Sequence, residues 1–184
     1  MKMFAIELRK ERRTGVIPLL PVPGILGALY AFIIFFLRKD TLLNLPMAPM
    51  DVLLTQVYGM TAILNMFGIV AAACMIYGME FSGNAVKKMY LLPVRISDMY
   101  LCKFLFLTVM LLTAVCFQYL ALTKIGMANL PPGTFDLDVL LTFAGYSFIT
   151  SMPVLSSMVF AASRFPNMWV PLGIGVAGFL SGMA

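Results

Sequence analysis

Residues 80–103 read EFSGNAVKKMYLLPVRISDMYLCK and separate two of the most apolar stretches of the chain. The segment carries four basic residues, and apolar residues recur at four-residue spacing from Phe81 to Met89 before Pro93 ends the pattern. A basic, amphipathic segment between two runs of membrane-spanning length has to lie at the water interface. The stretch therefore predicts a polytopic membrane protein with an interfacial helix between two of its spans.

The composition supports a membrane protein over the whole chain. The 184 residues are 61% hydrophobic and only 11% charged, whereas a soluble domain is about 25% charged. The chain therefore lacks the polar surface that a water-soluble globule requires. No secretory signal peptide is predicted, because Glu7 and Glu11 interrupt the N-terminal region and no small-residue cleavage site follows.

We expect an all-α, polytopic membrane helical bundle that forms a single domain over residues 1–184. A span requires about 20 apolar residues. The predicted elements are an interfacial helix at 1–14, spans at 16–37, 52–78, 100–123, 138–163 and 168–184, and a cytoplasmic segment at 80–98. The fifth span reaches the last residue without a polar flank, so we expect the sequence to be truncated.

The distribution of Lys and Arg predicts the orientation. With a cytoplasmic N-terminus, ten basic residues lie inside: Lys2, Arg9, Lys10, Arg12, Arg13, Lys87, Lys88, Arg95, Lys103 and Arg164. The remaining three, Arg38, Lys39 and Lys124, lie outside. Anionic membrane lipid then accounts for the net charge of +5, and no nucleic-acid partner is expected.

Polar residues within the predicted spans have two interpretations. In membrane proteins such side chains usually hold helices together, but they can also line the path of an amphiphilic substrate. The candidates are Gln56, Thr61, Asn65, Ser147 and Ser151. The pattern GFLSG at 178–182 is typical of close helix packing, either on the rest of the bundle or on a second permease subunit.

The chain lacks the residues that catalysis would require. It contains no His, and its acidic residues lie at the ends of the predicted spans, which disfavours a proton-coupled pump. Gly78 and Gly83 have the spacing of a phosphate-binding loop, but Asn84 and Ala85 follow where Lys and Ser or Thr are required. We predict no enzymatic activity, no catalytic residues, no cofactor and no metal site in this chain.

Three short motifs carry a family resemblance. The first is FAIELRKERR at 4–13, before the first span. The second is Glu80 followed by Gly83-Asn84 and by LLPVR at 91–95, and the third is YLCKF at 100–104. In order and spacing the chain resembles the permeases of ABC-2 type transporters, and in particular the compact permease subunits of bacitracin resistance and lantibiotic immunity.

The resemblance implies that the insert is a coupling helix seated on a cytoplasmic ABC ATPase. The implied contact residues are Glu80, Asn84, Lys87, Lys88, Tyr90, Leu91 and Arg95. It also implies a multi-pass protein of the cell membrane that pairs with a second permease subunit, identical or different, and exports an amphiphilic peptide antibiotic or lipid-like molecule. Members of this family usually have six spans, so the sixth is expected to be missing here.

Two other functions remain open. A scaffold or sensor subunit could use the same basic insert to hold a cytoplasmic partner without transport. A small channel or an ATP-independent carrier is a further alternative. An ATPase that is retained with the chain, and is lost on charge reversal of Lys87, Lys88 and Arg95, would favour the permease.

Overall fold

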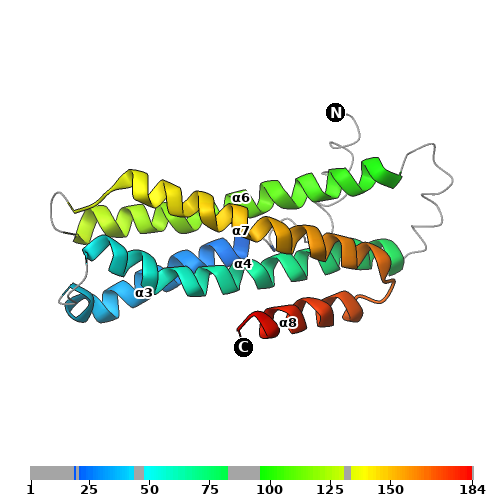
Figure 1. Ribbon diagram of the computed structural model, residues 1–184, viewed down its shortest axis with the longest axis horizontal. Helices are drawn as coiled ribbons and strands as arrows, with labels where there is room; N and C mark the ends of the chain where they lie inside the picture. The colour runs from blue at the N-terminus through cyan, green and yellow to red at the C-terminus, as the bar shows by residue number, and fades with distance from the viewer. Residues whose placement is uncertain (1–18, 20, 44–47, 83–95, 131–133, 184) are drawn as a thin grey trace.

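The computed structural model describes residue 19 and residues 21–43, 48–82, 96–130 and 134–183. Within these ranges the chain folds into five α-helices and no strand (Figure 1). The helices are α3 (Pro21–Leu43), α4 (Pro49–Ser82), α6 (Ile96–Asn129), α7 (Leu137–Arg164) and α8 (Trp169–Met183). The predicted interfacial helix at 1–14 lies outside the described residues.

The predicted membrane helical bundle is confirmed. Among the described residues, four helices are long and apolar enough to cross a membrane: Pro21–Arg38, Pro49–Phe81, Ser97–Asn129 and Leu137–Arg164. The predicted fifth span corresponds to α8, which is a shorter apolar helix of 15 residues.

The second and third spans are longer than the sequence pattern predicted. Helices α4 and α6 each contain 34 residues, which corresponds to a length of about 50 Å at 1.5 Å per residue. The hydrocarbon core of a bilayer is only about 30 Å thick. Both helices also extend into the predicted segment 80–98. Glu80 belongs to the last turn of α4, and Asp98 belongs to the first turn of α6.

Local sequence explains where several helices begin or change direction. Helix α4 begins at a proline, which suits the first helical position because its backbone nitrogen needs no partner there. Asp136 caps α7, since its carboxylate accepts hydrogen bonds from the backbone amides of Asp138 (2.9 Å) and Val139 (3.4 Å). Arg38 has non-helical backbone angles and marks a kink near the end of α3.

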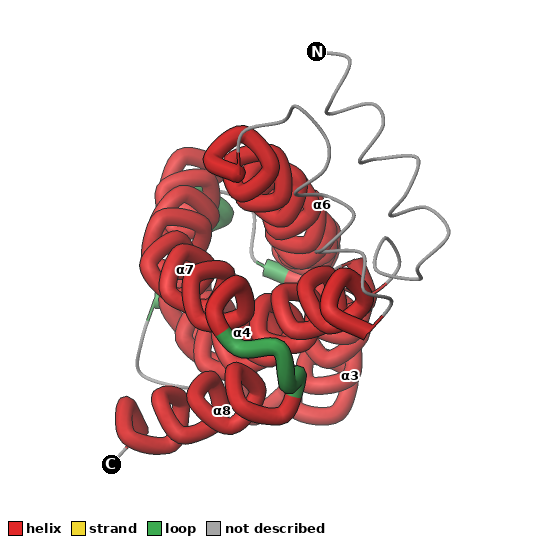
Figure 2. The backbone as a smooth tube through the Cα atoms, turned by 90° about the vertical axis from the view of Figure 1, so that its right-hand side faces the viewer, coloured by secondary structure: helices red, strands yellow, loops and turns green. Residues whose placement is uncertain are grey.

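Helix α4 organises the bundle, because it contacts each of the other four described helices. Helices α3, α4, α6 and α7 group around one axis, and α8 lies outside them against α4 and α7 (Figure 2). Successive helices alternate in direction (Figure 1). The end of α4, the beginning of α6 and the end of α7 consequently meet at one end of the bundle.

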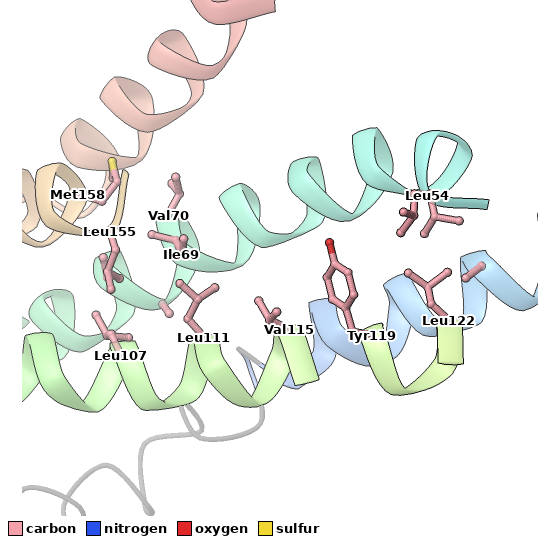
Figure 3. Packing of buried hydrophobic residues seen from close by; sticks show 14 of the residues in the cluster. Leu54, Ile69, Val70, Leu107, Leu111, Val115, Tyr119, Leu122, Leu155 and Met158 are labelled. Atoms are coloured by element: carbon pink, nitrogen blue, oxygen red, sulfur yellow. The ribbon is translucent and has the colours of Figure 1, made fainter. Parts of the chain in front are cut away.

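The apolar core lies between α3, α4, α6 and α7, and α6 contributes one face to it. Leu107, Leu111, Val115, Tyr119 and Leu122 recur at three- or four-residue spacing on α6, as residues on one helical face do (Figure 3). All five side chains are buried. They face α4, where Leu54 and Ile69 belong to the same buried cluster (Figure 3).

The outward face of the bundle is also apolar. Large side chains such as Phe36 on α3, Leu120 on α6 and Ile149 on α7 are exposed by 88%, 61% and 65%. An apolar surface of this extent on several helices is unfavourable in water but suits contact with lipid. The burial pattern therefore agrees with the membrane assignment.

Helix α3 approaches α6 closely at Gly24. A Cβ atom added to Gly24 would lie 2.8 Å from both the Cα and the carbonyl oxygen of Ala114. These are backbone atoms, so they cannot move aside without shifting α6. Glycine at this position allows the two helix backbones to pack directly against each other, as small residues do in membrane helix pairs.

We predict that Gly24→Ala separates α3 from α6 and lowers the free energy of unfolding by about 1–3 kcal/mol, the usual cost of overpacking. Unfolding of the purified protein by SDS titration would measure the change. Gly145→Ala on α7 is the matched control, because a Cβ atom there meets nothing within 4 Å. Equal stability of the two variants would contradict the proposed close contact.

Candidate functional site

Most of the predicted ATPase-contact residues lie outside the described structure. These are Asn84, Lys87, Lys88, Tyr90, Leu91 and Arg95. The remaining one, Glu80, lies two residues before the end of α4. The described part of the candidate site is therefore the pair of helix ends that flank residues 83–95.

At these helix ends Glu80 forms a buried ion pair with Lys103 of α6. The Lys103 ammonium donates to Oε2 of Glu80, and the two side chains are only 2% and 5% exposed. The same ammonium lies 4.3 Å from the centroid of the Tyr77 ring, within the range of a cation–π interaction. Tyr77 and Glu80 are three residues apart and lie on the same face of α4.

The position of Lys103 differs from what is usual for a lysine near the end of a membrane helix. A lysine near a helix end usually extends its ammonium to the interface, but this ammonium points into the protein. The physical reason is the carboxylate of Glu80, whose charge compensates for the loss of water. Removing one partner of a buried ion pair generally costs about 3–5 kcal/mol, because the other charge is left uncompensated.

A second polar contact joins three helices deeper in the bundle. Asn65 of α4 and Gln118 of α6 exchange two amide hydrogen bonds, at 3.1 Å and 2.9 Å. Nε2 of Gln118 also donates to the carbonyl oxygen of Pro23 on α3 at 3.3 Å. Asn65 and Gln118 are 2% and 1% exposed. A Cβ atom at Gly27 would lie 2.9 Å from Nε2 of Gln118, so this glycine leaves room for the amide.

A third polar contact connects α6 with α7. The hydroxyl oxygens of Tyr119 and Ser147 are 2.6 Å apart, and Tyr119 also donates to the carbonyl oxygen of Phe143 at 3.1 Å. Ser147 is therefore held in a contact between α6 and α7.

The remaining predicted polar residues are placed differently. Thr61 is buried, and its hydroxyl donates to backbone carbonyls of its own helix at Val57 and Tyr58. The hydroxyl of Ser151 likewise donates to the carbonyl of Ser147. Gln56 is exposed on α4. Asn65 and Ser147 thus make contacts between helices, while a role of any of these five residues in a substrate path stays a prediction.

Sequence reasoning missed Gln118, Tyr119 and the pairing of Lys103. Gln118 had a usable signal, because an amide in the middle of an apolar run usually finds a polar partner on another helix. Its partner could not be identified, since the contact depends on the relative register of α4 and α6. The sequence signal at Tyr119 is weaker, because tyrosine side chains in membrane helices also commonly make only apolar contacts.

An apolar groove of about 270 Å³ lies between α4, α7 and α8. Met66, Val70, Met158, Gly178 and Phe179 are among the residues that line it. Helix α8 is attached beside the groove through the rings of Phe67 and Phe179, whose centroids are 5.2 Å apart.

The glycines of α8 do not pack as the sequence pattern suggested. A Cβ atom at Gly175 would lie 2.7 Å from Val70, so this is where α8 approaches α4 closely. Gly178 and Gly182, which form the predicted packing motif, have nothing within 4 Å of an added Cβ atom. The expectation that this motif packs on the rest of the described bundle is therefore wrong.

No group of three or more His, Cys, Asp or Glu side chains that could hold a metal ion occurs among the described residues. The expected absence of a metal, a cofactor and an active site in the whole chain stays a prediction.

We predict that Gln118→Leu destabilises the protein by about 1–2 kcal/mol, because it leaves the buried amide of Asn65 without its partner. The double variant Asn65→Leu with Gln118→Leu should cost less than the sum of the two single changes. SDS unfolding of all four proteins would complete this double-mutant cycle. Gln56→Leu serves as the control with an exposed amide, and strict additivity would contradict the paired arrangement.

Comparison with protein families identifies the bundle. The family described as "ABC-2 family transporter protein" matches residues 3–182. Searches of curated proteins and of solved structures gave no match. Because the family match covers nearly the whole sequence and agrees with the helical membrane architecture, the chain belongs to the ABC-2 family and is a transmembrane permease subunit of an ABC transporter.

Proposed function

We propose that this permease exports an amphiphilic substrate, such as a peptide antibiotic or a lipid-like molecule, and is driven by a separate cytoplasmic ATPase. Membership of the ABC-2 family implies association with an ABC ATPase in general. The observation that carries the assignment of the contact is that the end of α4 and the beginning of α6, the two longest helices of the described structure, meet at one end of the bundle (Figure 1). Residues 83–95 join these two helices in the sequence.

The basic residues of this connection support contact with a cytoplasmic protein. Lys87, Lys88 and Arg95 lie in it, and Arg164 ends α7 at the same end of the bundle (Figure 1). Enrichment in Lys and Arg is typical of the cytoplasmic side of a membrane protein. In this orientation, closure of the ATPase subunits around ATP would displace residues 83–95 and hence α4 and α6.

Transport then requires two conformations of a permease pair. A second permease subunit, identical or different, would complete the path, and ATP binding would favour one conformation by its differential affinity for the two. Gly182 of α8 supports such a pairing, because a Cβ atom there would meet no described residue of its own chain within 4 Å.

The groove between α4, α7 and α8 supports an amphiphilic substrate. Its volume of about 270 Å³ is slightly below the ~300–1,000 Å³ of typical ligand pockets. It therefore suits the apolar part of a larger molecule. The lining is mostly apolar, with the hydroxyl-bearing Ser157 among its residues, so that a hydrocarbon portion could enter from the membrane.

A scaffold or sensor subunit is the alternative, since it would use the same basic connection to hold a partner. The groove favours transport, because a scaffold has no need of an apolar recess next to lipid. A partner that is retained but hydrolyses no ATP would favour the scaffold.

We predict that an ATPase co-purifies with the chain and that reversing the charges at Lys87, Lys88 and Arg95 to Glu removes it. The reason is the loss of electrostatic complementarity at the contact. Retention of the ATPase and ATP hydrolysis by the purified complex would be measured.

The matched control is Lys124→Glu, which changes an exposed lysine near the opposite end of α6 and should retain the ATPase. A cysteine introduced at Asn84 should react with an impermeant thiol reagent only from the cytoplasmic side. Labelling from the outer medium would contradict the proposed orientation and, as a consequence, the proposed contact with the ATPase.

We predict that Gly178→Leu reduces the protection that the transporter gives cells against cationic amphiphilic peptide antibiotics. The new side chain would fill the groove, yet it meets nothing within 4 Å at its Cβ atom, so folding should be preserved. Gly173→Leu is the control, because this position is equally open but does not line the groove. Growth inhibition would be compared at equal expression, and equal protection by both variants would contradict a role of the groove.

A further inference from the structure

The buried ion pair joins the two helices at the point where the proposed ATPase contact connects them. Glu80 and Lys103 are 23 positions apart in sequence, and the whole of residues 83–95 lies between them. Glu80 precedes the end of α4 by two residues, and Lys103 is the eighth residue of α6. The two helix ends that flank residues 83–95 are therefore tied together inside the protein.

The contacts of the Lys103 ammonium fix α6 along the axis of α4. The ammonium meets the Glu80 carboxylate and the Tyr77 ring, which are separated by about one helical turn on α4. Sliding of one helix along the other would therefore break at least one of the two contacts. Apolar packing alone is not directional and would allow such sliding more easily.

Stability alone does not require this arrangement. A buried ion pair contributes little net stability compared with well-packed apolar side chains of similar volume. Apolar residues surround the pair along the same two helices, for example Ile76 on α4 and Leu107 on α6, both of which are buried. An ion pair in such surroundings is better explained by the specific alignment that it imposes.

We propose that Tyr77, Glu80 and Lys103 form a clamp that makes α4 and α6 move as one unit when residues 83–95 are displaced. Glu80 and Lys103 are then positioning residues for transport, and Glu80 acts through Lys103 rather than by touching the ATPase. The mechanical role rests on the proposed function, whereas the alignment of the two helices by the clamp does not.

The test measures the distance between spin labels at Met75 on α4 and Leu101 on α6, in a background with Cys74, Cys102 and Cys116 replaced. In the purified complex with its ATPase we expect one narrow distance distribution. We expect the same distance without nucleotide and after trapping with ATP and vanadate. Lys103→Arg should preserve this behaviour, because the guanidinium can contact both the carboxylate and the ring.

Lys103→Met should broaden the distribution about twofold, because the two helices then sample several alignments. The double variant Glu80→Leu with Lys103→Met removes both charges and should fold stably. It should show the same broadening, together with a distance that changes on trapping. Lys124→Met, an exposed lysine on the same helix, is the control and should behave like the unmodified protein.

Two results would overturn the clamp. One is a double variant with the same narrow distribution as the unmodified protein, and the other is an unmodified complex in which the distance changes on trapping. If no ATPase co-purifies with the unmodified chain, the proposed function fails instead. The width of the distance distribution without nucleotide still decides whether the clamp aligns the helices.

Discussion

The buried polar contacts between α4 and α6 are the constraint on which the alignment of the bundle depends. Helix α4 touches every other described helix, and apolar residues of α6 from Leu107 to Leu122 lie in the same buried cluster as those of α4. Within a membrane, apolar packing does not distinguish strongly between protein and lipid neighbours. The hydrogen bonds and charges along this contact therefore determine which faces meet and in which register.

Polar contacts are found at different depths of this contact. The Glu80–Lys103 pair lies near one end, and the Asn65–Gln118 amides lie in the interior, where Gln118 also reaches Pro23 of α3. Lys103 and Gln118 are fifteen residues apart on α6, or about 22 Å along the helix. Two specific contacts separated by this distance define both the alignment and the relative rotation of the helices.

The sequence was sufficient to predict the membrane class and the order of the four long helices. These features depend on local composition, because a run of apolar residues acts without distant partners. The partner of Asn65 and the burial of Lys103 were not predictable, since each depends on how two helices are aligned. The packing of α8 through Gly175 instead of Gly178 was missed for the same reason: a spacing motif does not specify which face meets a neighbour.

The candidate site was predictable only in part. The basic connection was recognisable from its charges and from its place between two apolar runs. The extension of α4 and α6 into it was not, because the apolar pattern weakens near Glu80 while the helices continue. Glu80, which sequence reasoning assigned to a partner contact, pairs in the structure with a lysine of the same chain, and its contact with an ATPase stays a prediction.

The lengths of α4 and α6 have a consequence for the membrane in which this protein functions. Their apolar ranges Pro49–Phe81 and Ser97–Asn129 each contain 33 residues, or about 50 Å of helix, whereas the hydrocarbon core of a bilayer is about 30 Å thick. Hydrophobic stretches longer than this core adjust to it by tilting or by thickening the lipid around them. Because polar contacts join α4 to α6, a change in bilayer thickness would alter the tilt of both helices together.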